Sequence, residues 1–327
     1  MKKKFNIKEY QQSFLAEDRL EALYDEKLFK IFVPRKYGGL ELDLTSGVRE
    51  LIRIASIQGG LGWALNLGAG ANWFSGFLSD QGANEIFSPQ NAVIAGSGFV
   101  SGTFEQQGDQ FSINGTWSRC TGAQYANFFS LKAKNEAGDI KTFVIPREQV
   151  TIADEKWAIT GLRNTSSYAI SIQDERIPEQ YEFEINTILN SNAYGVHAVP
   201  FETFARVCMC ASFIGIVKCL SECCVEFSLN EPSLEYINLE LQPMINAAEK
   251  CCIDWAQRVD ALAPSDQVTT TTSDQLKIEL TQQNLGLFQA VQQLFLKGGL
   301  PLVEEDTLVH WAYRDVLTAV QHQMVKG

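Results

Sequence analysis

The first 88 residues carry hydrophobic side chains at helical spacing. Val48, Leu51, Ile52 and Ala55 follow the i, i+3, i+4, i+7 pattern of a helix that buries one face. Before this stretch, a segment that starts at Val33 continues with proline and ends in two glycines. Proline disfavours helix at the residue before it, and glycine permits a tight turn. The pattern therefore predicts helices joined by a turn in this region.

The middle of the chain alternates between hydrophobic and polar residues over short stretches. The pairs Gly-Asp at 108–109 and Asn-Gly at 114–115 are turn signals that separate these stretches, and the alternation returns over residues 168–178. Short alternating stretches with such turns predict antiparallel hairpins. About one hundred residues are enough for a small barrel or sandwich.

From residue 201 onward the chain again has the pattern of helices. Long amphipathic segments are expected near 201–229, 235–262, 274–297 and 305–325. Breaks such as Asn-Glu-Pro at 230–232 separate them, because proline and turn-forming residues interrupt a helix. Four such helices predict an up-down four-helix bundle.

Together these patterns predict an α+β multidomain protein. An N-terminal α-helical domain is expected over residues 1–89, a central antiparallel β-barrel or sandwich over 90–194, and the C-terminal four-helix bundle over 195–327. A chain of 327 residues with 45% hydrophobic and 20% charged residues is long and apolar enough to bury a substantial core.

The net charge and the lack of a long apolar run limit the kinds of partner that this protein is expected to bind. The formal net charge of −12 would repel a phosphate backbone, so no nucleic-acid partner is expected. No run of about 18 apolar residues is found that could span a bilayer, and no apolar segment follows the N-terminal lysines as in a signal peptide. We therefore expect no membrane partner and a cytoplasmic protein.

Eight cysteines are present, and several lie in vicinal or i, i+4 positions within the predicted helices. Such placement suits reduced thiols that pack as small hydrophobic side chains. The alternative is a thiolate metal cluster that joins Cys219 and Cys223 on one helix with Cys251 or Cys252 on another. The spacing is not that of a zinc ribbon or a ferredoxin, so no metal site is expected.

Several motifs occur in the order found in the flavin-dependent acyl-CoA dehydrogenase superfamily. Residues 161–167 read Gly-Leu-Arg-Asn-Thr-Ser-Ser, and the strand after them ends in Asp-Glu-Arg-Ile-Pro at 174–178. Pro-Arg-Lys-Tyr-Gly-Gly at 34–39, Gly-Gly at 298–299 and Tyr-Arg-Asp at 313–315 resemble further motifs of that superfamily. The resemblance implies its fold, with a helical domain, a β-domain and a four-helix bundle, and a flavin cofactor.

The resemblance also implies where the flavin would lie. Thr121 falls where the family places a hydroxyl residue near the flavin N5 edge, and a fixed hydrogen-bond partner there tunes the ring. The other implied cofactor-binding residues are Gly122, Ser97, Thr165, Ser167 and Trp157. For Thr121 the alternative is a threonine packed on the face of a strand. Thr165 and Ser167 could instead serve only to form the turn.

The base that a dehydrogenase needs is missing from its expected place. In the common dehydrogenases a glutamate follows the Tyr-Arg-Asp element, but this chain has Gln323 there, and a neutral amide accepts no proton near neutral pH. His322 instead resembles the related two-component flavin-dependent monooxygenases, which take reduced flavin from a separate reductase and use oxygen to hydroxylate a small molecule. An imidazole, with an ordinary pKa near ~6.5, suits an acid/base role. The alternative is a solvent-exposed histidine at the end of the last helix.

Three functions therefore stay open. The first is oxidation of a small organic substrate by oxygen and flavin held in its reduced form, with Thr121 and His322 as catalytic residues. The second is an acyl-CoA dehydrogenase with a relocated base, such as Glu304 or Glu305. The third is a degenerate homologue that binds a ligand or partner without catalysis. Because relatives assemble through the bundle, a homodimer or homotetramer is expected.

Some positions depart from the family pattern. Arg119 stands where an aromatic residue usually covers the flavin, and Asn72 or Trp73 stands where the monooxygenases often have a catalytic histidine. His310 lies one helical turn before Arg314, where it is expected to pack or pair. The bundle lacks the Arg…Gln-x-Phe-Gly pattern that grips the adenine half of FAD, so FAD and FMN both stay open.

Overall fold

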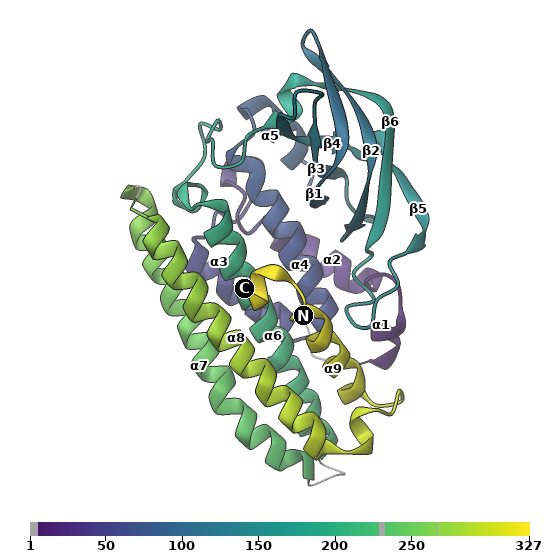
Figure 1. Cartoon of the computed structure of the whole chain (residues 1–327), viewed down its shortest axis with the longest axis vertical. Helices are drawn as coiled ribbons and strands as arrows, with labels where there is room; N and C mark the ends of the chain where they lie inside the picture. The colour runs from purple at the N-terminus through teal and green to yellow at the C-terminus, as the bar shows by residue number, and fades with distance from the viewer. Residues whose placement is uncertain (1–5, 229–232, 266) are drawn as a thin grey trace.

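The computed structural model describes residues 6–228, 233–265 and 267–327 of the chain. A β-sheet lies at one end of an elongated molecule and the long C-terminal helices extend toward the other, with N-terminal helices packed between them (Figure 1). Helices, then strands, then helices follow one another along the chain, as the sequence predicts.

The described residues of the N-terminal part form five α-helices, with short 3₁₀ turns between some of them. These are α1 (Ile7–Gln11), α2 (Glu17–Asp25), α3 (Leu44–Ala55), α4 (Gly59–Asn72) and α5 (Asp80–Phe87). The predicted turn before α3 is confirmed, and Gly38 adopts a left-handed φ of 77° there. In α4, Gly62 lies where this helix packs closely on α3, since a Cβ there would lie 2.2 Å from the Ala55 Cα.

In the described part of the chain, seven strands form one sheet in the order β5-β6-β2-β1-β3-β4-β7. The strands are β1 (Ile94–Gln107), β2 (Gln110–Cys120), β3 (Phe128–Lys134), β4 (Ile140–Pro146), β5 (Thr151–Lys156), β6 (Tyr168–Pro178) and β7 (Glu182–Phe183). Neighbouring strands are antiparallel except β1 and β3, which run parallel. The antiparallel prediction is wrong for that pair, because the first half of β1 is rich in glycine and serine and gave no strand signal.

A second correction concerns the pair Asn114 and Gly115, which the sequence predicts as a hairpin turn. β2 continues through both residues, and Gly102 of β1 pairs with Gly115. A Cβ on Gly115 would lie 2.6 Å from the Gly102 Cα and 2.8 Å from the ring of Trp117. Glycine is therefore needed here for close packing beneath a buried tryptophan, and the chain turns earlier, at Gly108.

The C-terminal part contains α6 (Phe201–Ser228), α7 (Ser233–Leu262), α8 (Thr270–Gly298), α9 (Leu308–Ala319) and α10 (Gln323–Lys326). The predicted break at 230–232 lies outside the described residues. The single helix predicted over 305–325 is wrong at its end, because His322 has an extended backbone with ψ 132° and caps α10. Its Nδ1 accepts a hydrogen bond from the Met324 N–H at 3.2 Å.

α6 is more apolar than we expected from the sequence. Over Phe201–Phe227 it is long and apolar enough to cross a bilayer by composition, but most of that stretch is buried inside the protein. It packs against α3, α4, α7, α8 and α9, so it is the central helix of the helical core. Core packing accounts for its composition.

The thiols pack as the sequence predicts. All eight cysteines are free, and seven of them are buried. The Cys252 Sγ donates to the Val207 carbonyl at 3.7 Å, and burial raises the pKa of Cys252 well above its ordinary value. Among the described residues, no group of three or more His, Cys, Asp and Glu side chains is arranged to hold a metal ion.

Candidate functional site

The pairing of β2 with β6 brings two of the predicted site residues together. Cys120, the last residue of β2, pairs with Tyr168, the first residue of β6. The residues just beyond this pair, Thr121 and Ser167, therefore lie side by side. Their hydroxyl oxygens are 3.0 Å apart.

A chain of three hydroxyl groups starts at this contact. The Ser167 Oγ also lies 2.9 Å from the Thr165 Oγ1, which donates to the Leu162 carbonyl at 2.9 Å. Thr165 and Ser167 are 3% and 7% exposed, whereas Thr121 is half-buried. Thr165 and Ser167 thus use their hydroxyls within the protein, and Thr121 forms the end of the chain that a ligand can reach.

Gly122 belongs to the same framework. It lies in the left-handed region with φ 85°, which favours glycine, and its N–H donates to the Thr165 carbonyl at 3.0 Å. This backbone bond fixes the segment after β2 against the 161–167 turn. The hydroxyl chain is therefore held by main-chain as well as side-chain bonds.

The 161–167 turn is fastened to α9 through the Tyr-Arg-Asp motif. The Leu162 N–H donates to the Asp315 Oδ1 at 2.5 Å, and the Gly161 N–H donates to the Thr318 Oγ1 at 2.8 Å. The Arg314 Nε donates to the Thr160 carbonyl at 2.8 Å. Two motifs that are about 150 residues apart in the sequence thus form one unit, in which α9 positions the turn.

The N-terminus of α4 packs against the 161–167 turn and α9. A Cβ on Gly59 would lie 2.5 Å from the Asp315 Oδ2, and one on Gly60 would lie 1.8 Å from the Asn164 Oδ1. Burial raises the pKa of Asp315 to about 7, although the backbone N–H groups of Leu162 and Gly60 and the charge of Arg314 oppose the shift. Within the described chain, the Asp315 Oδ2 and the Asn164 Oδ1 have no hydrogen-bond partner.

Trp157 directly follows β5, and Ser97 lies within β1. The Trp157 N–H donates to the Ser167 carbonyl at 2.9 Å, and its indole ring is 39% exposed. The guanidinium of Arg119 lies 5.1 Å from the centre of that ring. Ser97 lies at an irregularity of β1, where the register with β3 shifts, and in the described residues no hydrogen bond joins it to the hydroxyl chain.

His322 is neither at a frayed end nor fully exposed. Its ring is half-buried and lies edge-on to Trp63 of α4, with ring centres 5.6 Å apart. Arg206 and Asn284 hold the backbone that follows it, through the Met324 and Val325 carbonyls. Burial, with a smaller effect of the Arg206 charge, lowers the pKa of His322 below its ordinary value.

Trp63 lies one helical turn after Gly60, so the same end of α4 contacts both His322 and the 161–167 turn. No hydrogen bond of the described residues joins His322 to Thr121. His322 thus contacts this helix end directly, whereas Thr121 is joined to it only through the 161–167 turn.

The remaining candidate residues, His310, Glu305 and Asn72, interact with other parts of the protein. The His310 ring bonds to the Leu302 carbonyl and to Arg314, so the expectation that it pairs is confirmed. The Glu305 carboxylate is 75% exposed and lies 4.0 Å from Arg314. Asn72 is buried, and its side-chain amide bonds to the carbonyls of Phe29 and Ala92 and to the Ile94 N–H. Asn72 therefore joins these backbone segments and has a structural role.

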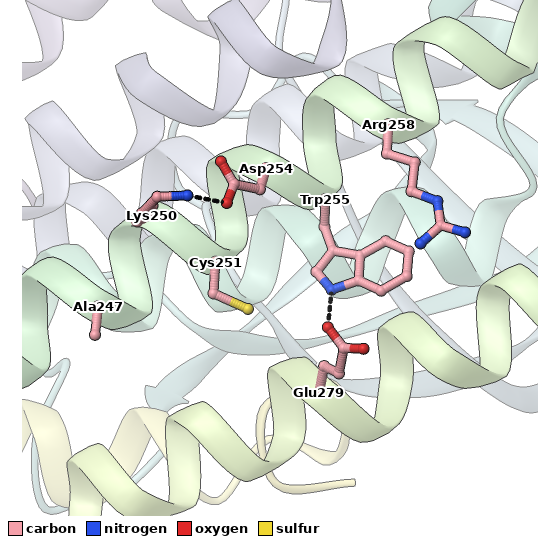
Figure 2. Close-up of a pocket in the computed structure, with 7 residues that line it drawn as sticks. All are labelled: Ala247, Lys250, Cys251, Asp254, Trp255, Arg258 and Glu279. Atoms are coloured by element: carbon pink, nitrogen blue, oxygen red, sulfur yellow. Dashed lines mark hydrogen bonds and ion pairs between the residues drawn. The ribbon is translucent and has the colours of Figure 1, made fainter.

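A groove on the outer face of the bundle contains none of the predicted site residues. It has a volume of about 370 Å³ and lies between α7 and α8 (Figure 2). The Trp255 Nε1 donates to the Glu279 Oε2 at 2.8 Å across it, and Lys250 pairs with Asp254. Cys251 opens into this groove, whereas Cys219 is buried in the core.

Sequence comparison connects the chain to oxygenases. The oxygenase subunit HsaA of a flavin-dependent monooxygenase from Rhodococcus jostii (strain RHA1) is 24% identical over 214 residues, which are 62% of this chain and 56% of that protein. The matched region thus spans little more than half of that relative's length. No family model matches the chain.

Solved structures resemble nearly the whole fold. The 3-HSA hydroxylase from Rhodococcus sp. RHA1 has a TM-score of 0.89 at 20% identity, covering 97% of this chain and 89% of that one. XiaF from Streptomyces sp., in complex with FADH2 and glycerol, has a TM-score of 0.86 at 18% identity, covering 97% and 87%. Butyryl-CoA dehydrogenase from Megasphaera elsdenii has a TM-score of 0.77 at 15% identity, covering 98% and 91%.

These likenesses show the fold and name the relatives. The fold is that of butyryl-CoA dehydrogenase and of the 3-HSA hydroxylase, and the curated relatives are named flavin-dependent monooxygenases and hydroxylases. The resemblance and the fold class predicted from the sequence are therefore confirmed.

Sequence reasoning missed the residues that support the hydroxyl chain. Asp315 was recognised only as part of a motif, and Thr318 and Asn164 were not singled out at all. The signal for Asp315 was present, because a carboxylate among the many apolar positions of a helix invites a contact with another segment. Nothing in the sequence shows which segment that is.

Proposed function

We propose that this protein is the oxygenase component of a flavin-dependent monooxygenase, which uses reduced flavin and O₂ to hydroxylate a small organic substrate. The observation that carries the proposal is the hydroxyl chain ending at half-buried Thr121, in a fold whose curated relatives are named flavin-dependent monooxygenases. A separate reductase would supply the reduced flavin.

The residues around Thr121 fit one edge and one face of a flavin ring. A flavin is a flat ring with an apolar face and polar N–H and carbonyl edges, so it needs directed hydrogen-bonding groups beside apolar surface. The Thr121 hydroxyl is a directed polar group, and the exposed indole of Trp157 is apolar surface joined to it through Ser167. When bound, a reduced flavin would supply the electrons that activate O₂.

His322 is the proposed acid/base group of the site. Because its Nδ1 accepts the Met324 N–H, the neutral ring carries its proton on Nε2, where it can donate to a ligand. Its lowered pKa favours this neutral form at neutral pH. His322 can therefore hold a proton at a fixed atom, whereas Gln323 beside it cannot exchange one.

The His322→Ala variant is expected to uncouple oxygen use from hydroxylation. With reduced flavin and a panel of small aromatic substrates, the wild type should consume more oxygen than it releases as hydrogen peroxide. In the variant the two amounts should become equal, because loss of a positioned proton donor lowers productive turnover by about a hundredfold. Oxygen-electrode traces with a peroxide assay measure both quantities.

Gln321→Ala is the matched control, since it changes an exposed neighbour on the same segment. The role assigned to His322 is wrong if the ratio of peroxide to oxygen is the same in wild type and His322→Ala. An acyl-CoA dehydrogenase would instead reduce a dye with an acyl-CoA and no oxygen. Among the described residues, no hydrogen bond joins a carboxylate to the Thr121 hydroxyl.

A homodimer or homotetramer is proposed to form through the bundle. On α8, Ile278, Leu285 and Leu296 are 56%, 36% and 77% exposed. Their spacings of 7 and 11 residues correspond to about two and three helical turns, so these side chains share one outward face. Exposed apolar side chains in a row are typical of a surface that another protein covers.

Ile278→Glu is expected to lower the molar mass in solution to that of a smaller assembly, because it places a charge in the apolar row. Light scattering at matched concentration measures this. Gln283→Glu, the same charge change at another exposed position of α8, should leave the mass unchanged. A wild type that is monomeric at these concentrations would contradict the proposal.

A further inference from the structure

The direction of the hydroxyl chain is fixed at its buried end. The Thr165 Oγ1 lies 2.9 Å from the Leu162 carbonyl oxygen, which can only accept, so Thr165 must donate there. A hydroxyl group has a single proton. Ser167 must therefore donate to Thr165, at 2.9 Å, and Thr121 must donate to Ser167, at 3.0 Å.

The opposite direction is disfavoured by burial. If Ser167 accepted from Thr165, the Thr165 and Leu162 oxygens would face each other at 2.9 Å without a proton between them. Both Thr165 and Ser167 are buried, so water is not at hand to replace the lost bond. The backbone bonds of Gly122 to Thr165 and of Trp157 to Ser167 hold the oxygens in place.

We infer that Thr165 and Ser167 are positioning residues that make Thr121 a hydrogen-bond acceptor toward its ligand. Thr121 donates its proton to Ser167. The lone pairs of the Thr121 oxygen then face the open side, where no other described group bonds to this hydroxyl. Such a group recognises a ligand N–H and repels a bare ring nitrogen.

This inference rests on the proposed function and deepens it. A reduced flavin carries hydrogen on ring nitrogen N5, whereas an oxidised flavin has a lone pair there. With the N5 edge at Thr121, where the resemblance places it, a fixed acceptor there favours the reduced ring. The preference arises from two buried side chains that do not touch the flavin themselves.

The test is the ratio of two dissociation constants, that for oxidised flavin over that for reduced flavin, measured anaerobically by fluorescence titration with FMN, FMNH₂, FAD and FADH₂. In Ser167→Ala the Thr121 proton has no acceptor within the chain and can turn toward the ligand. The ratio is expected to fall by about tenfold, which corresponds to about one hydrogen bond. Thr165→Val removes the acceptor for the Ser167 proton, so Ser167 can donate to Thr121 and Thr121 can donate to the ligand. The ratio should fall in this variant too.

Thr165→Ser keeps the hydroxyl and is the matched control, with an unchanged ratio expected. The inference is overturned if the wild type binds flavin but neither Ser167→Ala nor Thr165→Val changes the ratio by more than about twofold. Circular dichroism identifies a variant that has not folded, and the other variant then decides. A wild type that binds neither redox state overturns the proposed function and this inference together. The wild type thus tests the function, and the variants test the positioning.

Discussion

Gly161→Ala is expected to lower the free energy of unfolding by about 3 kcal/mol, the upper end of the cost of overpacking a tight contact. A Cβ at this position would lie 2.1 Å from the Arg314 carbonyl oxygen and 2.6 Å from the Asp315 backbone nitrogen. Both atoms belong to the backbone of α9, which cannot move aside as a flexible side chain would. The turn must separate from the helix, and the Gly161–Thr318 and Leu162–Asp315 bonds are lost with it.

Urea unfolding followed by tryptophan fluorescence and circular dichroism measures this effect. Gly286→Ala is the matched control, because nothing lies within 4 Å of a Cβ built there, in the interior of α8. Alanine is a better helix former than glycine, so this variant should gain about 0.5–1 kcal/mol. If Gly161→Ala proves as harmless as Gly286→Ala, the turn and α9 are not packed as described.

Asp315→Asn is expected to change how stability depends on pH. Burial raises the pKa of Asp315 from 3.8 in its ordinary state to about 7 in the folded protein. Between these values the folded protein binds more protons than the unfolded chain, so the free energy of unfolding of the wild type falls as pH rises from about 4 to about 7. The full fall attributable to Asp315 is about 4 kcal/mol, at 1.36 kcal/mol per unit of pKa.

An asparagine at position 315 stays neutral throughout and still offers an oxygen to the Leu162 N–H. The stability of Asp315→Asn relative to wild type should therefore increase from pH 4 to pH 8. Asp254→Asn, the same substitution on the exposed face of α7, controls for the change of carboxylate to amide. A constant difference between Asp315→Asn and wild type over this range would show that Asp315 does not take up a proton on folding.

The helices were well predicted because their signals are local. The spacing of Val48, Leu51, Ile52 and Ala55 depends only on neighbours along one helix, and α3 buries these side chains. The strands were less well predicted where packing overrides local preference. Gly115 has the chemistry of a turn but lies inside β2, because Gly102 and Trp117 leave no room for a side chain.

The candidate site was predicted in its parts but not in its connections. Thr121, Thr165 and Ser167 were named from a resemblance, yet their order along one hydroxyl chain depends on the pairing of β2 with β6. The contact of Asp315 with Leu162 spans 153 residues of sequence. The break before α10 was missed because the apolar pattern continues across it, whereas α9 ends at Ala319 and the bond of His322 to the Met324 N–H caps the start of α10.

The central claim is that this chain holds reduced flavin beside Thr121, and an anaerobic titration of the wild-type protein with FMNH₂ and FADH₂ tests it most directly. Saturable binding of at least one of them, tighter than binding of its oxidised form, is the predicted result. If neither reduced nor oxidised flavin binds at any concentration up to solubility, the account of the site is wrong.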